Sequence, residues 1–399
     1  MSDVAVPTQR ATVGAFRRTL QSLLGPWFST IPERLIVFQL ACQIGMLIPY
    51  LAPLRKLFRA GSFGSSGVVL VYLLATRRGG EKLHPATRPV AAVLALLLLS
   101  LLHPETNSVK SALAQIAMYV SILGPLLWVA YCRCEVDGLR RVLLILLAFH
   151  ALSSFFGVLQ ATYPGEYQPA LAFEGSYQHE IRLASGERVL RPMGLTDSPG
   201  GAATSGFYAV LLGTCFLVAG RTRKTKTLGG LGIALGMFCL YLAQSRSRFL
   251  MTIAAVAVFV GILGLRGQLK RLVIVFVIGQ ALALGSFAWA VSVGGDSATR
   301  RLRTLVEDDP GELAYERGYF LEETFVKIIP KYPLGAGMAR WGQMYAYFGD
   351  RNSSPPIYVE VQLTGWILDG GIPLAVLYYL ALGMATWVAW RLATRLPTG

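Results

Sequence analysis

The sequence predicts an all-α protein that crosses a membrane about ten times. Of its 399 residues, 54% are hydrophobic and only 15% are charged, and the mean hydropathy is +0.51. A soluble globular domain carries about 25% charged residues, so the composition excludes that class. The hydrophobic residues form runs of roughly the length of a membrane span, and basic residues stand in short clusters between them. These observations predict a single polytopic membrane domain over 35–399.

A polar segment, residues 1–34, precedes the first run and has an amphipathic patch from Phe16 to Phe28 that is expected to lie along the inner leaflet. The apolar runs cover approximately 35–54, 63–76, 89–103, 111–131, 142–160, 200–220, 228–244, 249–265, 272–293 and 372–390. The first run lacks a small-residue cleavage site, so we expect it to remain as a signal anchor. The stretch Ile357 to Leu368 is short and interrupted by polar residues, which is typical of a re-entrant or partly buried helix.

The distribution of Lys and Arg sets the orientation of these spans. With the N-terminus inside, the inner segments hold about twenty basic residues and the short outer loops about six. Both termini are therefore expected in the cytoplasm. Two long hydrophilic segments, about 161–199 and 294–356, then lie on the outer, periplasmic side and carry most of the acidic residues. Connections of this length are uncommon unless they are functional.

Several classes of function lack support. The net charge of +15 is explained by the inner basic clusters, and no nucleic-acid-binding signature accompanies it. The sequence has no phosphate-binding P-loop, no H-E-x-x-H and no paired C-x-x-C motifs, so that no metal and no cofactor is expected. Cys132-Arg133-Cys134 is too short a motif to indicate a metal site. Membrane lipids are the expected surroundings, and nucleic acid is not an expected partner.

The first candidate site is the turn Gln244–Arg248, between the runs 228–244 and 249–265. Its Ser245, Arg246 and Arg248 fall on the predicted outer face, where short loops normally avoid basic residues. Arginines at a membrane boundary are costly unless they reach water or an anion. Two interpretations stay open on the sequence alone, namely contact with lipid phosphates and an anion site that faces the bundle.

The second candidate begins at Arg191 and continues through Gly194 and Asp197 into the span at 200–220. Glycines here permit close backbone approach and expose the N–H groups of a helix start, which suits an anionic oxygen. An ordinary helix start with a surface arginine is the alternative.

The third candidate is Arg317, on a helix expected over Leu313 to Ile329 that would lie over the mouth of the bundle. A turn rich in proline and glycine follows, with Gly335 and Gly337, and returns the chain to the membrane. A helix and its stop signal explain the turn equally well, but they do not explain Arg317.

The fourth candidate is the segment of Glu360 and Gln362, which precedes Asp369 and the last span. A carboxylate in an apolar setting is a functional candidate. Glu360 would serve as a base toward a hydroxyl group or as an ion-pair partner for one of the arginines.

In their order, these motifs resemble the superfamily of O-antigen ligases and O-antigen polymerases of bacterial surface polysaccharide synthesis. An Arg–Gly segment before a middle span corresponds to Arg191 and Gly194, and a Ser–Arg end of a later span corresponds to Ser245 and Arg246. An outer-loop arginine followed by P-L-G-A-G corresponds to Arg317 and Pro333–Gly337. A polar segment before a glycine-rich entry to the last span corresponds to Glu360 to Ile372. The similarity covers roughly residues 185–385, and the first half matches only in hydropathy.

The resemblance implies an enzyme of the inner membrane that joins repeat units carried on a polyprenyl pyrophosphate. Arg191, Arg246 and Arg317 would stabilise the charge of the pyrophosphate leaving group, with Arg248 in reserve. Glu360 or Asp197 would assist the acceptor hydroxyl, and Ser245, Gly335, Gly337 and Gln362 would line the substrate site. Flippase and chain-length regulator proteins are the candidate protein partners. The resemblance also allows about one or two further spans.

One departure from the superfamily affects the choice of activity. Ligases usually carry a His–Asn pair after the P-x-G-x-G turn, whereas the corresponding stretch here, Asp350–Pro356, contains no histidine. This favours polymerisation of repeat units over ligase-type transfer to another acceptor. The other alternative is a transporter of an anion or a lipid-linked sugar, which would use the same arginines without forming a bond.

Overall fold

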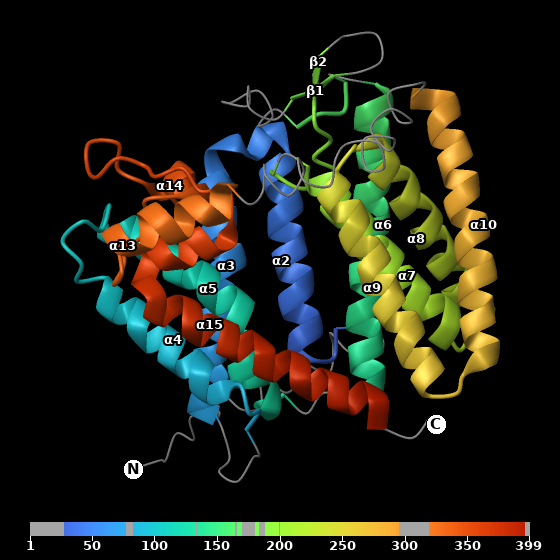
Figure 1. Cartoon of the computed structure of the whole chain (residues 1–399), viewed down its shortest axis with the longest axis horizontal. Coiled ribbons are helices and arrows are strands. Elements are labelled where there is room, and N and C mark those ends of the chain that lie inside the picture. The colour runs from blue at the N-terminus through green and yellow to red at the C-terminus, as the bar shows by residue number, and fades with distance from the viewer. Residues whose placement is uncertain are drawn as a thin grey trace, which may run out of the picture.

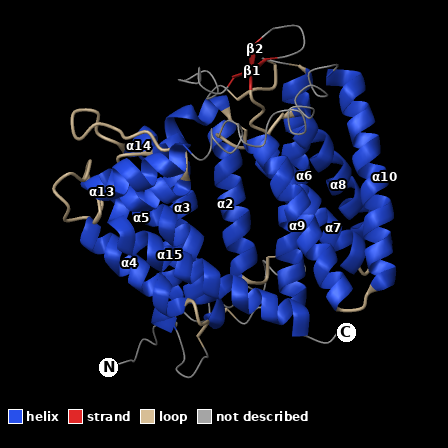
Figure 2. Ribbon diagram, viewed as in Figure 1, coloured by secondary structure: helices blue, strands red, loops and turns tan. Residues whose placement is uncertain are grey.

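The computed structural model describes residues 28–76, 83–132, 135–163, 166–169, 180–182, 188–198, 200–294 and 319–395, which are mostly helical (Figure 2). Within these ranges the only paired strands are β1 (Glu180–Arg182) and β2 (Arg188–Leu190), which are antiparallel with Glu180 opposite Leu190. The predicted helical class is therefore confirmed, with this short hairpin as an addition. The N-terminal amphipathic patch and Arg317 lie outside the described residues.

Eight of the described helices are long and apolar enough to cross a membrane, which confirms a multi-pass membrane protein. Two further helices coincide with predicted apolar runs but are shorter. They are α2 (Ile31–Leu47), with 17 residues, and α4 (Thr87–Ser100), with 14 residues. The count of ten spans stays a prediction that depends on α2 and α4.

The helices form two groups with α2 between them (Figure 1). The first group contains α3 (Arg55–Thr76), α4, α5 (Val109–Trp128) and α15 (Gln362–Arg395), with the short elements η4 (Thr324–Ile328), α13 (Ile329–Lys331) and α14 (Gly342–Phe348). The second group contains α6 (Val136–Thr162), α7 (Gly201–Ala219), α8 (Arg223–Leu242), α9 (Arg246–Leu265) and α10 (Leu269–Gly294). Because α2 packs on both α3 and α6, it joins the two groups.

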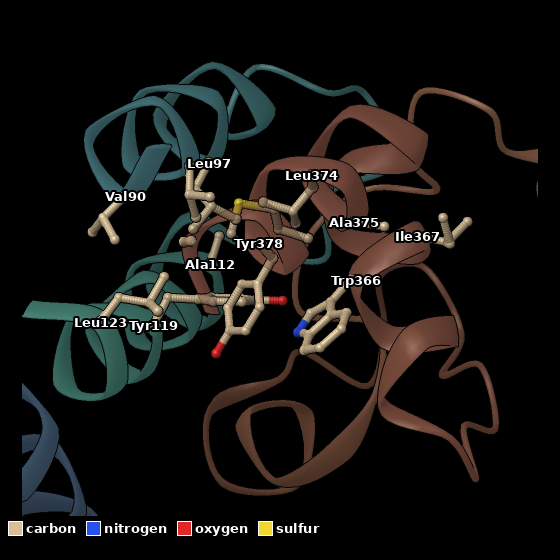
Figure 3. Close-up of a cluster of buried hydrophobic side chains, with 13 residues drawn as sticks. Val90, Leu97, Ala112, Tyr119, Leu123, Trp366, Ile367, Leu374, Ala375 and Tyr378 are labelled. Carbon is tan, nitrogen blue, oxygen red and sulfur yellow. The ribbon is translucent and has the colours of Figure 1, made fainter. Parts of the chain in front are cut away.

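The core of the first group is closed by α15, which packs against α4 and contacts α5 through side chains (Figure 3). Leu97 and Leu374 are fully buried in it, and the Trp366 ring stacks on Tyr378 with centroids 4.2 Å apart. Tyr378 meets Tyr119 of α5 edge to face. Aromatic pairs of this kind fix the rotation of α15 against its neighbours.

In the second group, α7 and α8 approach each other through paired glycines. A Cβ on Gly206 would lie 2.8 Å from the carbonyl oxygen of Gly236, and one on Gly213 would lie 2.6 Å from that of Gly229. Gly206 and Gly213 are seven residues apart on α7, and Gly229 and Gly236 are seven residues apart on the antiparallel α8. Small residues at such positions let two membrane helices pack backbone to backbone.

Two predicted boundaries near the N-terminal end of the described chain are wrong. The first run, 35–54, is divided because α2 ends at Leu47 and Pro49–Leu54 forms a tight 3-10 turn, with prolines at both Pro49 and Pro53. The second run begins earlier than residue 63, because α3 already starts at Arg55.

The last span is a broken helix. In α15, Gly370 and Gly371 leave the helical conformation, and Gly371 has a φ of 71°. The stretch Gln362–Asp369 is therefore a separate helical piece, mostly buried, as expected for the partly buried helix predicted before the last span. The second piece continues to Arg395, beyond the predicted end at 390.

Successive long helices alternate in direction, so that α2 begins and α15 ends on the same side of the bundle (the lower side in Figure 1). We call the opposite end, where α6 and α8 finish and α3, α7 and α9 begin, the outer end, after the predicted orientation. An ion pair joins the starts of α2 and α6 on the inner side, with Arg141 Nε 2.7 Å from the fully buried Glu33 carboxylate. Which side faces the cytoplasm stays a prediction.

Candidate functional site

The predicted arginines that the structure describes all lie at the outer end of the second helix group. Arg191 directly follows β2, and Arg246 and Arg248 belong to the first turn of α9. The start of α7 also lies at this end, and α7 packs against α9. Arg317 cannot be placed, because residues 301–318 lie outside the described ranges.

A fixed turn holds the segment that follows Arg191. The side chain of Gln160, near the end of α6, accepts hydrogen bonds from the backbone N–H groups of Met193 and Gly194, both at 2.8 Å. Its amide also donates to the Gly194 carbonyl at 3.1 Å. Gly194 has a φ of 62°, and a Cβ there would lie 2.6 Å from Ser153 Oγ. The backbone of Arg191 is thus anchored, and its half-buried side chain has an Nε without a hydrogen-bond partner among the described residues.

The start of α7 does not expose free N–H groups, contrary to expectation. The Gly201 N–H donates to the Ser198 carbonyl at 2.9 Å, and the Ala203 N–H donates to the Gly200 carbonyl at 3.1 Å. Gly201, Ala202 and Ala203 are also buried. The segment folds back over its own helix start, so that the helix dipole is covered by backbone and Arg191 is the group available to an anion.

Asp197 lies in a buried network. Its carboxylate forms an ion pair with Arg59 of α3, and the two side chains are 4% and 5% exposed. It also accepts hydrogen bonds from the Tyr347 hydroxyl of α14 at 2.8 Å and from the Gln43 amide of α2 at 3.3 Å. Three partners engage the carboxylate of Asp197, which favours a positioning role over contact with a substrate hydroxyl.

Arg55 and Arg59, two of the roughly six basic residues that the sequence assigns to short outer loops, are buried. Their exposed fractions are 9% and 4%. The Arg59 guanidinium also lies over the rings of Phe63 and Tyr347, at 5.2 and 5.1 Å from their centroids. The spacing of four residues in an outer segment is the signal that would have placed both side chains on one helix face.

The turn before α9 is as short as the sequence indicates. Helix α8 ends at Leu242 and α9 begins at Arg246, with Gln244 at a φ of 50° between them. Ser245 stands at the N-cap without a side-chain capping bond, and its side chain is half-buried. Cations in the first helical turn oppose the positive end of the helix dipole, which makes an anion beside Arg246 and Arg248 favourable.

Gly335 and Gly337 belong to a turn that packs against the break in α15. The Ala336 N–H donates to the Leu368 carbonyl at 2.7 Å, and the Ile372 N–H donates to the Pro333 carbonyl at 2.9 Å. Gly337 has a φ of 91°, and a Cβ there would collide with the backbone of Glu105. Both glycines are buried, and they allow close contacts between backbone segments. Because they are not exposed, the structure does not support their predicted part in substrate binding.

The acidic residues of the C-terminal segment differ from expectation. Glu360 is exposed rather than set in apolar surroundings, and it accepts a hydrogen bond from the Tyr358 hydroxyl at 2.7 Å. Gln362 is exposed at the start of α15. The buried carboxylate is Asp369, 1% exposed, which accepts bonds from Tyr119 at 2.7 Å and from Gln115 at 2.8 Å, both on α5.

A second network ties the loop before α5 to the C-terminal segment. The Asn107 amide donates to the carbonyls of Asp350 and Ser354, at 2.9 and 3.2 Å, and its oxygen accepts from the Asp350 N–H at 2.7 Å. Nearby, the buried Arg340 reaches the Glu105 carboxylate at 3.4 Å. The segment Asp350–Ser354 lies within Asp350–Pro356, the stretch compared above with the His–Asn pair of the ligases, and here the Asn107 side chain holds it in place.

The described residues include no group of three or more histidine, cysteine, aspartate or glutamate side chains that is arranged to hold a metal ion. No protein-family model matches the chain, and no curated protein and no solved structure matches it either.

Proposed function

We propose that the chain is a membrane glycosyltransferase of the bacterial inner membrane that joins oligosaccharide repeat units carried on a polyprenyl pyrophosphate. The observation that carries the proposal is that Arg191 and Arg246 both lie at the outer end of the bundle. Arg191 follows β2 and Arg246 begins α9, and each stands beside a short, constrained turn. The motif resemblance supplies the substrate class, and the multi-pass fold agrees with a lipid-linked donor.

The chemistry needs stabilisation of negative charge more than it needs an acid. The acceptor hydroxyl oxygen forms a bond to the anomeric carbon, and the bond from that carbon to the pyrophosphate oxygen breaks. The bonding electrons leave on the pyrophosphate, and the hydroxyl proton passes to a base or to water. Guanidinium groups are permanently charged and bind phosphate oxygens with two parallel hydrogen bonds, so that Arg191 and Arg246 suit the leaving group.

The two carboxylates expected to assist the acceptor, Asp197 and Glu360, differ in how well they are placed to act as a base. Asp197 is engaged by Arg59, Tyr347 and Gln43, whereas Glu360 is exposed and bonded to a nearby tyrosine hydroxyl. Glu360 is therefore the better base of the pair. Arg59 and Asp197 contribute by fixing the segment between Arg191 and α7.

Transport of a lipid-linked sugar is the second candidate function, and the break in α15 favours it. A helix interrupted at Gly370 and Gly371 beside the buried Asp369 is a feature of many transporters. Ligase-type transfer to another acceptor would use the same arginines as polymerisation and differs only in the acceptor.

Purified protein in vesicles, given a polyprenyl-pyrophosphate-linked oligosaccharide, separates these functions. Lengthening of the glycan supports polymerisation, and movement across the bilayer without lengthening supports transport. Arg191→Ala and Arg246→Ala are expected to lower the polymerisation rate by about 10²- to 10³-fold each. Arg223→Ala, on the exposed inner start of α8, is the matched control and should retain the rate. Long chains from both outer variants would refute the arginine mechanism.

A further inference from the structure

A cavity of about 340 Å³ lies inside the second helix group, between α7, α8, α9 and α10. Its lining runs along α9 from Phe249 to Val260, a rise of about 16 Å. The other walls come from the middle of α8, from Val210 to Leu217 of α7, and from Val275 to Ala283 of α10. The cavity therefore extends from the turn before α9 into the apolar interior of the helix group.

The walls of this cavity are apolar in chemistry as well as in composition. Three lining residues are polar, and one of them, Gln280 of α10, is exposed at the surface of the group. The other two, Thr214 and Thr252, donate their hydroxyl protons to carbonyls of their own helices, at Val210 and Arg248, both at 2.7 Å. Their polar atoms are thereby satisfied, and methyl groups remain for contact. A cavity with such walls favours a hydrocarbon over water.

The cavity opens toward the surroundings of the bundle. Two of its lining residues, Ile253 of α9 and Phe276 of α10, are 53% and 62% exposed. A chain in the bilayer can therefore enter from the side between α9 and α10. At the outer end the lining reaches Phe249, which follows Arg248 directly and Arg246 by one helical turn.

We propose that this cavity holds part of the polyprenyl chain of the donor, with its phosphate end at Arg246 and Arg248. The inference rests on the proposed function and adds a site for the tail. Charge complementarity supports it, because an apolar cavity that begins directly after Arg248, and one turn after Arg246, matches an amphiphile with an anionic head. An engineered cavity of about 150 Å³ accepts benzene, so that the present volume accommodates roughly two or three isoprene units.

Gly279 provides a sharp test of this placement. It lines the cavity on α10, and a Cβ added there would meet nothing within 4 Å. Gly279→Phe would therefore fill the cavity without a clash in the backbone. Gly285 is on the same helix, outside the lining, and a Cβ there also meets nothing within 4 Å. Gly285→Phe is the matched control for bulk, hydrophobicity and position in the helix.

The experiment uses the full chain in phosphatidylcholine nanodiscs with a tritiated polyprenyl monophosphate that carries a photoreactive diazirine in its second isoprene unit. In the wild-type protein, mass spectrometry should map the label to α9 and α10. Labelling should fall about tenfold in Gly279→Phe and stay within about twofold in Gly285→Phe. Excess unlabelled polyprenyl monophosphate should compete, and excess phosphatidylglycerol should not.

Three results would overturn the inference: label mapped outside α7–α10, equal labelling of both phenylalanine variants, or equal competition by phosphatidylglycerol, which would indicate an ordinary acyl-chain site. The wild-type map needs no variant to fold. A glycan-lengthening assay keeps the two proposals distinguishable. If the glycan is not lengthened but the label maps to the cavity, the proposed polymerase activity is rejected and the tail site is retained. If the glycan is lengthened but the label maps elsewhere, the polymerase activity is retained and the tail site is rejected.

Discussion

Arg59 of α3 and Asp197 of the segment before α7 form a buried ion pair between the two helix groups. Removing one partner leaves the other charge buried without compensation, which costs about 3–5 kcal/mol. We therefore expect Asp197→Ala to lower the thermal unfolding temperature in detergent strongly. The double variant Arg59→Met, Asp197→Leu should recover much of that loss. Asp137→Ala is the control, since its pairs with Arg140 and Arg221 are exposed, and it should change little. Equal effects of the buried and exposed variants would contradict the assignment.

The paired glycines of α7 and α8 predict a contrast between neighbouring positions. A Cβ on Gly229 would lie 2.7 Å from the Gly213 carbonyl oxygen, whereas one on Gly230 meets nothing within 4 Å. Gly229→Leu should separate the helices and destabilise the fold by at least about 1–3 kcal/mol. Gly230→Leu should leave stability unchanged. Monodispersity on size exclusion and thermal unfolding measure both, and a stable Gly229→Leu variant would disprove the close packing.

Arg246 and Arg248 are expected to differ in function although they lie two residues apart. Arg248→Ala should retain polymerisation within about threefold, because Arg246 remains to bind the phosphate end of the donor. Arg246→Lys keeps the charge but loses the planar, two-pronged donor, so its rate should fall by about tenfold or more. The rate of glycan lengthening in vesicles measures both. A larger loss in Arg248→Ala than in Arg246→Lys would reverse their roles.

The hydrogen bonds of Asn107 are expected to hold the segment Asp350–Ser354 in its folded position. Asn107→Ala removes two donated bonds and leaves the Asp350 N–H without its acceptor, which costs about 1–3 kcal/mol. Amide hydrogen exchange should accelerate across this segment in the variant. Asn352→Ala, exposed in the same loop, is the control and should preserve the wild-type exchange rates. Unchanged exchange in Asn107→Ala would show that other contacts hold the loop.

The sequence was sufficient for the helical membrane class and for the place of the turn before α9, because both depend on local hydrophobicity and charge. It was not sufficient for Asp197 or Arg59, which are distant in the chain and meet only when α3 packs beside the start of α7. Glu360 and Asp369 both stand in an apolar stretch of sequence, yet only Asp369 is buried. Their difference follows from tertiary contacts with α5, which hydropathy does not contain.

The core in Figure 3 has a consequence for the order of biosynthesis. Helices α4 and α5 are synthesised more than two hundred residues before α15, which covers them. Until then, Gln115 and Tyr119 have no Asp369 to bind, and the faces that bury Leu97 and Tyr119 are open to lipid or to an insertion factor. A ribosome-bound chain that stops before Gln362 thus carries an unfinished first group beside a second group whose helices are already complete.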